Sequence, residues 1–213
     1  MIHVLFEQSN TFRDVFNRPE NTSRFHAYAV SYDIEDTANI VGDIITPLAA
    51  GKNPLLCDAS GDRVIAFFPC TYFSQYNDLI FSGESTIFRA MTEHRKEEYI
   101  RARLKEYYKY ATAVQNLVKL CKEKKYPLII ENPASCTIKH LLGAPTVAHE
   151  RGRYGDRMCK RTYWYMYNGA QLHTENMTIY PRVRRSDIEH RRGLSRSLIA
   201  VEYAENFINN LEW

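Results

Sequence analysis

The chain of 213 residues is long enough for one well-buried domain with a small appendage but too short for two full domains, so we expect a single domain over residues 1–213. Hydrophobic residues make up 45% and charged residues 25% of the chain, which is ordinary for a globular protein, and no apolar run approaches the length of a membrane span. The net charge of +3 is modest and excludes a strongly basic or strongly acidic protein.

The first elements expected along the chain are a short buried strand and a helix. The strand is "HVLF" (residues 3–6), and after a polar turn "TFRDVFN" places Phe12 and Phe16 on one helix face, four positions apart. Residues 17–24 are rich in Asn, Pro and Ser and indicate a loop.

Two further expected strands end in carboxylates. "FHAYAVSYDIED" (residues 25–36) predicts a strand that carries Asp33 to its end, and "ANIVGDI" (residues 38–44) predicts another that ends at Asp43. Residues 47–62 are less regular, with room for one short helix before the next strand.

That next strand ends at a thiol. Residues 64–68 of "RVIAFFPCTYFS" form the continuous apolar block that is typical of a strand covered on both faces, as in a parallel sheet. Pro69 and Cys70 follow it directly, and residues 71–85 show no clear period and indicate a loop.

A long helical stretch and another buried strand come next. Residues 86–125 are good helix formers, and the second half of this stretch has one apolar face that should pack on the core: Tyr107, Ala111, Val114, Leu117, Val118 and Cys121. Residues 126–133 ("YPLIIENP") repeat the pattern of an apolar strand that ends in polar residues. The repeated order of strand, helix and strand predicts a Rossmann-like α/β fold, a mostly parallel sheet with helices on both faces.

The last third of the chain is basic. Residues 161–168 and 177–183 alternate as strands do, including an antiparallel edge, and residues 195–213 predict an amphipathic helix. Residues 150–196 hold eleven Lys and Arg against five Asp and Glu, a formal charge of about +6. This charge suits a surface that faces nucleic acid, and it equally suits a solvated basic face.

Four reactive or charged side chains are expected at the carboxyl ends of these strands, where ligands bind in open parallel sheets. They are Asp33, Asp43, Cys70 and Glu131. Each alone has a structural explanation, such as a buried thiol or a turn. Together they predict one site at that rim.

At this point the motifs resemble those of the cytosine-5 DNA methyltransferases, most closely the short, phage-type members. "FFPCTYFS" resembles the Pro-Cys motif of that family and "IIENP" its Glu-Asn motif, in the same chain order. "VLFEQSNTFRDVF" stands where the first cofactor motif belongs, "SYDIED" and "VGDI" resemble the acidic strand end and the Gly-Asp-Ile motif, and "CKRTYWYM" resembles a compact form of the basic motif. The resemblance implies a class I methyltransferase fold and DNA methylation with S-adenosylmethionine as donor.

The resemblance also implies catalytic roles. The Cys70 thiolate would add to carbon 6 of cytosine, and Glu131 would offset, at nitrogen 3, the negative charge that develops on the ring. Asn132 would hold the Glu131 loop. Arg161, with Lys160 as the second choice, would contact the base oxygen or position the Cys70 loop.

The cofactor side carries a further set of implied roles. Asp33 would bind the ribose hydroxyls, Asp43 the adenine amine, and Phe6 would lie beside the adenosine, with Pro69 also in the cofactor-binding set. The partner would be DNA, or a free pyrimidine nucleotide, with the target base flipped out if it begins in a duplex.

Two features depart from the family pattern. Residues 7–10 ("EQSN") replace its glycine-rich turn. A short basic insert at about residues 167–193 stands in place of a target-recognition domain. Phosphate contacts are expected instead from a run of arginines in and near this insert: Arg182, Arg184, Arg185, Arg191 and Arg192.

Alternatives to the methyltransferase follow from these departures. One is a non-catalytic nucleotide- or nucleic-acid-binding protein of the same fold that acts as a decoy or inhibitor. Another is an enzyme of a different nucleotide chemistry, in which Cys70 attacks a pyrimidine ring in the same way but the one-carbon donor is of the folate type.

The compartment and the metal content are predicted from the termini and the cysteines. Five scattered cysteines without a Cys-x-x-Cys pair predict reduced thiols and no zinc site, and no metal is expected. The N-terminus lacks a basic segment followed by a long apolar one, so no secretory signal is expected and the cytoplasm is the default compartment.

Overall fold

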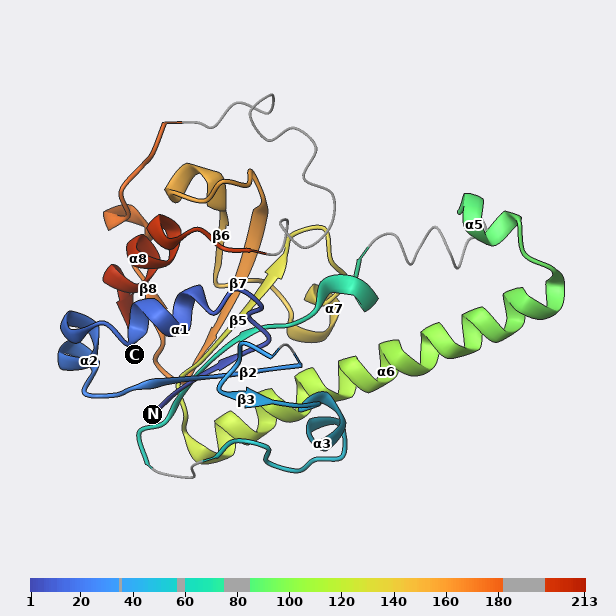
Figure 1. Ribbon diagram of the computed structural model, residues 1–213, viewed down its shortest axis with the longest axis horizontal. Helices are drawn as coiled ribbons and strands as arrows, with labels where there is room; N and C mark the ends of the chain where they lie inside the picture. Colours follow the sequence, from blue (N-terminus) through green and yellow to red (C-terminus); the bar gives the residue numbers. More distant parts are fainter. Residues whose placement is uncertain (35, 57–59, 75–84, 182–197) are drawn as a thin grey trace.

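The computed structural model describes residues 1–34, 36–56, 60–74, 85–181 and 198–213 (Figure 1). Its strands are β1 (Ile2–Leu5), β2 (Ala29–Asp33), β3 (Ile40–Val41), β4 (Arg63–Phe67), β5 (Leu128–Pro133), β6 (Val147–Glu150), β7 (Arg161–Tyr167), β8 (Gln171–Leu172) and β9 (Leu211–Glu212). Its α-helices are α1 (Thr11–Phe16), α2 (Pro19–Phe25), α3 (Ile45–Ala49), α5 (Thr86–Arg89), α6 (Glu93–Lys124), α7 (Lys139–Leu142) and α8 (Val201–Asn209). Short 3-10 turns are η1 (Cys70–Tyr72), η2 (Arg151–Tyr154) and η3 (Thr174–Asn176).

The central sheet has seven strands in the order β3-β2-β1-β4-β5-β7-β6. The pairs from β3 to β5 are parallel, and β7 runs antiparallel to both β5 and β6. The predicted mostly parallel α/β sheet is confirmed. The antiparallel strand predicted at residues 161–168 is also confirmed, but it lies one position inside the edge because β6, which the sequence pattern did not reveal, pairs along its outer side.

Two apolar cores cover the two faces of the sheet, because neighbouring residues in a strand point to opposite faces. In β4, Ile65 and Phe67 pack with helices α1, α2 and α8, whereas Val64 and Ala66 pack with α3 and α6. Figure 1 shows these helices as layers on either side of the sheet. The continuous apolar run in this strand is therefore explained by burial on both faces.

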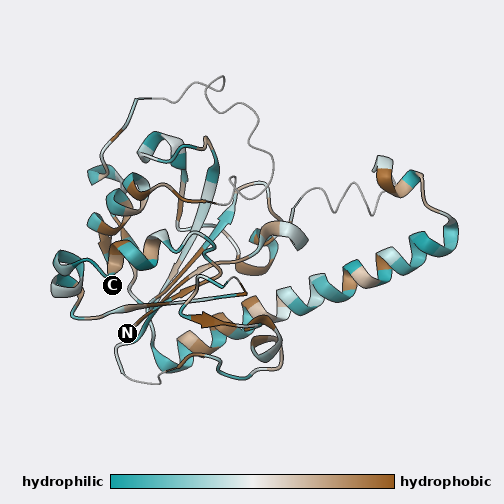
Figure 2. Ribbon diagram, in the orientation of Figure 1, coloured by the Kyte–Doolittle hydropathy of each residue, from teal (hydrophilic) through white to brown (hydrophobic). Residues whose placement is uncertain are grey.

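Helix α6 packs on the sheet through its second half only. The buried residues of this helix all lie between Ala111 and Cys121, and Tyr107 and Val118 pack against the same cluster, so the predicted apolar face is confirmed. The first half projects beyond the sheet (Figure 1), and its far end is largely hydrophilic, in contrast with the hydrophobic central strands (Figure 2). Thr92 caps the start of α6, because its side chain accepts a hydrogen bond from the backbone N–H of Arg95. Helix α6 is therefore a separate element from α5, which ends at Arg89.

Two local predictions are wrong. The loop expected over residues 17–24 is helix α2, which begins with Pro19 at its first turn, a position where the missing N–H of proline costs nothing. Residues 177–181 are not a strand, because the side chain of Asn206 takes both backbone groups of Thr178: its Oδ1 accepts from the N–H at 2.9 Å and its Nδ2 donates to the carbonyl at 2.7 Å.

The C-terminal helix is shorter than expected. It begins at Val201 and ends at Asn209, after which Leu211–Glu212 pairs with β8 (Gln171–Leu172), in the first part of the predicted insert. The rest of the insert, from residue 182 on, lies outside the described residues. Within the described ranges, every helix is too short or too polar to cross a bilayer, and no three His, Cys, Asp or Glu side chains gather as metal ligands would.

Candidate active site at the carboxyl rim of the sheet

A pocket of about 270 Å³ lies at the carboxyl ends of β1, β2, β4 and β5. It spans the point where the chain order reverses between β1 and β4, which is where open α/β sheets bind ligands. The loops from these strand ends bring together residues far apart in sequence, among them Phe6, Asp33, Pro69, Cys70 and Glu131. The predicted convergence at this rim is present for three of its four members, Asp43 being the exception.

Cys70 begins the turn η1, immediately after β4, and its half-buried side chain lines the pocket. A hydrogen bond from the Cys136 thiol, helped by the positive charge of Lys160, lowers the pKa of Cys70 to about 6, although burial and the charge of Glu131 oppose the shift. A thiol with such a pKa is largely thiolate at neutral pH, the form that acts as a nucleophile.

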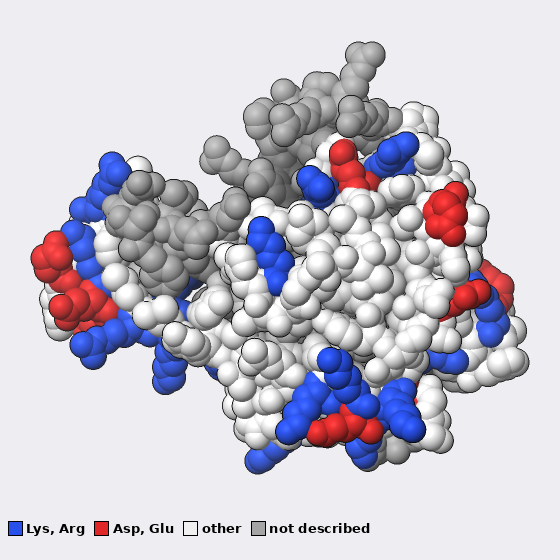
Figure 3. Space-filling view, turned by 180° about the vertical axis from the view of Figure 1, so that it is seen from behind, with Lys and Arg blue, Asp and Glu red and all other residues white. Residues whose placement is uncertain are grey.

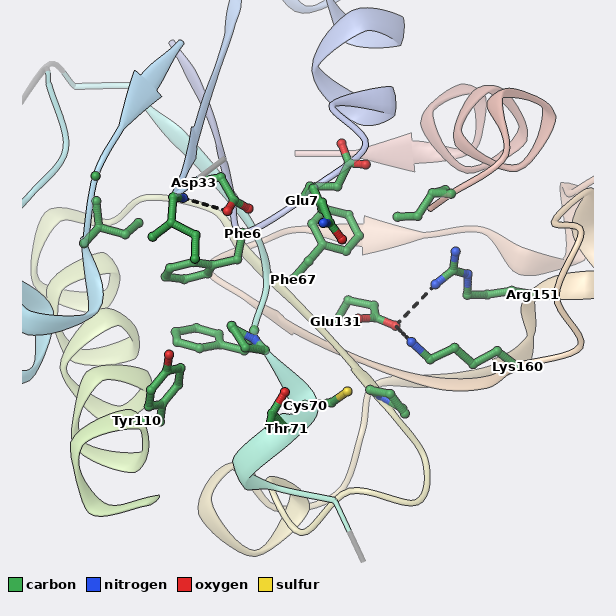
Figure 4. A pocket seen from close by; sticks show the side chains of 18 residues that line it. Phe6, Glu7, Asp33, Phe67, Cys70, Thr71, Tyr110, Glu131, Arg151 and Lys160 are labelled. Atoms are coloured by element: carbon green, nitrogen blue, oxygen red, sulfur yellow. Dashed lines mark hydrogen bonds and ion pairs between the residues drawn. The ribbon is translucent and has the colours of Figure 1, made fainter. Parts of the chain in front are cut away.

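Glu131 lies on the next parallel strand and is almost fully buried at the pocket wall. Its Oε1 atom is 3.8 Å from a guanidinium nitrogen of Arg151 and 4.0 Å from the Lys160 ammonium. Figure 4 shows both cations converging on this carboxylate, with Cys70 on the same side of the pocket. A carboxylate and two cations thus face the space beside the thiol.

Asn132 connects the ends of β4 and β5. It is fully buried, and its Nδ2 donates a 3.0 Å hydrogen bond to the carbonyl of Phe68, two residues before Cys70. This contact fixes the end of β5 against the end of β4.

Arg151 is the main residue of the site that sequence reasoning missed. Its side chain is only 4% exposed, forms an ion pair with Asp156, and lies 5.2 Å from the ring centre of Tyr203. Strand β6 runs parallel to β5, because both are antiparallel to β7. Arg151, the residue after the end of β6, therefore lies at the same rim of the sheet as Glu131. No sequence signal marked it, since β6 is short and partly polar.

Three of the residues that the resemblance assigns to cofactor binding, Phe6, Asp33 and Pro69, line the pocket. The ring of Phe6 packs 4.9 Å from that of Phe68, and Figure 4 shows Asp33 across the pocket from Glu131. The loop between β1 and α1 has no glycine, yet Phe6 and Asn10 adopt left-handed backbone angles, with φ of 60° and 55°. These are conformations that glycine adopts more readily, so the loop makes a tight turn without its usual residue.

Asp43 does not line this pocket. Its carboxylate accepts hydrogen bonds from the backbone N–H of Thr46, at 3.0 Å, and from the Thr46 hydroxyl, and it lies 3.5 Å from the Lys109 ammonium. Burial by itself would raise the pKa of Asp43, but the hydrogen bonds from Thr46 and the charge of Lys109 together outweigh it and lower the pKa. The same hydrogen bonds cap the start of α3. Its neighbours Gly42 and Ile44 line the pocket in its place.

The structure separates Arg161 from the pocket. Arg161 is the exposed first residue of β7 and lines a second cavity of about 380 Å³ together with His149 and Arg153. Lys160, one residue earlier, is the member of the basic motif that reaches Glu131. The predicted phosphate-binding residues Arg182, Arg184, Arg185, Arg191 and Arg192 lie outside the described residues.

Glu7 occupies the wall where the glycine-rich turn was expected. Its carboxylate accepts hydrogen bonds from the hydroxyl of Ser9 and, at 3.0 Å, from the backbone N–H of Phe12. Burial raises the pKa of Glu7 to about 7, and these hydrogen bonds and Arg151 oppose the shift only in part. The pocket therefore contains a second buried acid that the motifs did not single out.

The chain matches no protein-family model, no curated protein and no solved structure. The chemistry of the pocket therefore has to be argued from its own side chains and from their arrangement at the sheet rim.

Proposed function

We propose that this protein is an S-adenosylmethionine-dependent methyltransferase that acts on carbon 5 of cytosine, in DNA or in a pyrimidine nucleotide. The observation that carries the proposal is the pairing of Cys70, a thiol with a lowered pKa, with Glu131 at the end of the adjacent strand. Both face one pocket at the switch point of the sheet. A thiolate beside a carboxyl group is the pair that addition to a pyrimidine ring requires.

The chain's own residues account for the steps on the base. The Cys70 sulfur forms a bond to carbon 6, and the electron pair of the 5,6 double bond makes carbon 5 nucleophilic. Glu131 hydrogen-bonds nitrogen 3 and offsets the charge that develops on the ring. After carbon 5 has taken the methyl group, a water molecule accepts the carbon 5 proton, the 5,6 double bond re-forms, and the bond between carbon 6 and sulfur breaks to release the Cys70 thiolate. Lys160 and Arg151, whose charged nitrogens lie 4.0 Å and 3.8 Å from Oε1 of Glu131, would hold the carboxyl group in place.

The donor would bind on the side of the pocket that Phe6, Asp33 and Pro69 line. S-adenosylmethionine supplies a methyl group on a sulfonium centre, and Phe6, Asp33 and Pro69 would hold its adenosine part. Asp43 is engaged at the start of α3, so backbone and apolar groups at Gly42 and Ile44 would face the adenine instead.

The topology also supports the proposal. The order β3-β2-β1-β4-β5-β7-β6, with β7 reversed, agrees with the class I methyltransferase fold that the sequence resemblance implies. The reversal has a functional consequence, since it brings Lys160, at the start of the strand, to the carboxyl rim beside Glu131.

Covalent trapping tests the nucleophile. With DNA or a nucleotide containing 5-fluorocytosine and with S-adenosylmethionine present, wild-type protein should form a stable adduct, because fluorine at carbon 5 prevents the final elimination. Cys70→Ser should form none, and the matched control Cys159→Ser, which changes an exposed thiol, should be trapped as well as wild type. Trapping of Cys70→Ser would show that another residue is the nucleophile.

Calorimetry of S-adenosylmethionine and S-adenosylhomocysteine tests the cofactor site. We expect micromolar binding that Asp33→Ala abolishes. Asp43→Ala should retain binding but lose about 1 kcal/mol of folding stability, because its carboxylate caps α3. Absence of binding at millimolar ligand, with or without nucleic acid, would reject the methyltransferase.

The second candidate is a non-catalytic nucleotide- or nucleic-acid-binding protein of the same fold. Two observations favour it: residues 7–10 replace the glycine-rich turn, and Asp43 is turned toward α3. Nucleotide or nucleic-acid binding without binding of the methyl donor would select this candidate. Adduct formation with a folate-type donor in place of S-adenosylmethionine would select the third reading, in which Cys70 serves a different one-carbon transfer.

A further inference from the structure

The loop that follows β5 is held against the loop that carries the nucleophile. The backbone N–H of Thr137 donates a 2.6 Å hydrogen bond to the carbonyl of Phe73, and Ser74 and Cys136 form an isolated antiparallel bridge. The N–H of Cys136 donates to the carbonyl of Pro133 at 2.9 Å, which fixes this loop to the end of β5. The loop after β5 therefore holds the segment that follows Cys70.

Cys136 brings a second thiol to this loop. Its side chain is 2% exposed and belongs to the apolar cluster against which Cys70 packs. Cys70 packs against this cluster, and the bridge between Ser74 and Cys136 brings the loops of the two cysteines together. A buried cysteine beside an apolar cluster usually acts as a small hydrophobe, but this one lies in the loop that is bonded to the segment after the proposed nucleophile.

We propose that Cys136 is a positioning residue for the Cys70 nucleophile: its S–H group donates a hydrogen bond to the Cys70 sulfur, holds that sulfur at the pocket wall and stabilises its thiolate. This inference rests on the proposed function only in taking Cys70 as the reacting group.

The groups around Cys70 have opposing effects on its thiolate, so a hydrogen bond from the Cys136 S–H group would decide the balance. The ammonium of Lys160 favours the Cys70 thiolate, whereas the carboxylate of Glu131 and burial disfavour it. The hydrogen bond from Cys136 makes the largest contribution to lowering the pKa of Cys70, and the same bond together with burial raises the pKa of Cys136. The shared proton therefore stays on Cys136, and the negative charge stays on the sulfur that faces the pocket.

Alkylation of Cys70 by iodoacetamide as a function of pH tests the proposal without methyl donor or nucleic acid. The rate at each cysteine is read by peptide mass spectrometry in wild type, Cys136→Ala and Cys136→Ser. Serine keeps a hydrogen-bond donor of similar size, so it should restore what alanine loses. Cys121→Ala is the matched control, because Cys121 is also buried but lies on α6. Burial alone raises the pKa of Cys121, so its removal should not affect Cys70.

We expect Cys70 in Cys136→Ala to react about tenfold more slowly at pH 7 than in wild type, with its pH midpoint moved upward by more than one unit. Cys136→Ser should stay within about threefold of wild type, and Cys121→Ala should match it. Identical pH midpoints in wild type and Cys136→Ala would overturn the proposal. If these shifts of the Cys70 pH midpoint are observed but wild type does not bind the methyl donor, the proposed function is rejected while the role of Cys136 is retained.

A measurement on wild type alone covers the case in which the Cys136 variants fail to fold. Diamide takes two electrons and two protons from a pair of contacting thiols and leaves a disulfide. Mild treatment should link Cys70 to Cys136, with a mass loss of two hydrogens in the peptide pair, before any link to Cys121. A folded protein in which Cys70 resists this link while alkylating normally would show that the two sulfur atoms do not meet.

Discussion

At the scale of single residues, Glu7 makes the stability of the protein depend on pH. Its pKa is raised to about 7 by burial, so the folded protein holds this proton more tightly than the unfolded chain does. The stabilisation that this proton provides is complete below about pH 4.5 and is lost as the pH rises through 7. His149 acts in the opposite sense, because burial lowers its pKa to about 4 and its charging destabilises the fold in acid.

Glu7→Gln should remove this pH dependence. The amide oxygen still accepts the N–H of Phe12, but it cannot ionise, so we expect the variant to gain on the order of 3 kcal/mol relative to wild type between pH 5 and pH 8. Urea unfolding across this pH range measures the difference, which isolates Glu7 because His149 is common to both proteins. Glu20→Gln, a change at an exposed carboxylate, should track wild type, and parallel curves for Glu7→Gln would contradict the assignment.

At the scale of elements, α6 has two halves with different roles. From Ala111 to Cys121 the helix is part of the core, whereas the half before residue 107 has no buried residue and projects past the sheet (Figure 1). The projecting half approaches the site at one point, where Arg103 donates a 3.0 Å hydrogen bond to the carbonyl of Thr71, next to Cys70. Stability is therefore expected to differ along one continuous helix.

A pair of alanine-to-glycine changes tests this difference. Ala113→Gly should lower the free energy of unfolding by about 2 kcal/mol, because it loses helix propensity and a fully buried methyl group. Ala102→Gly loses the same propensity at an exposed position in the projecting half, and we expect less than about 0.5 kcal/mol there. Urea unfolding measures both, and a loss of about 1 kcal/mol for Ala102→Gly, the full cost in helix propensity, would show that the helix unfolds as one unit with the core.

At the scale of the whole molecule, the positive charge is unevenly distributed. Figure 3 shows Lys and Arg mixed with Asp and Glu on the projecting end of α6, whereas residues 150–196 carry about +6 by formal charge. Phosphate contacts from the latter segment would release counterions and make DNA binding depend on salt. The arginines concerned lie outside the described residues, so this expectation comes from charge alone.

Neutralising two of these arginines should change the salt dependence of DNA binding. For Arg184→Gln/Arg185→Gln we expect the slope of log K against log salt to fall by about 2 in magnitude. Lys119→Gln/Lys125→Gln is the control, because the end of α6 lies at the amino ends of the strands, opposite the pocket. A slope that is unchanged in the arginine pair, or lowered equally in both pairs, would assign the basic segment to solvated surface.

The sequence by itself determined the central strands β1, β2, β4 and β5, the parallel character of the sheet, and the places of Cys70 and Glu131 at its rim. These features follow from local pattern, because a strand buried on both faces is apolar throughout and its loop residues mark where it ends. The same local reasoning mistook α2 for a loop, since the composition of that segment suits both a turn and a helix start at Pro19.

Only the tertiary structure decided which groups surround Cys70 and Glu131. Arg151 enters the site because a short strand pairs along the outside of β7, and Asp43 leaves it because Thr46 draws its carboxylate to a helix cap. Cys136 meets Cys70 through contacts between loops more than sixty residues apart. Such contacts depend on how separate elements pack together, and no spacing within the chain encodes them.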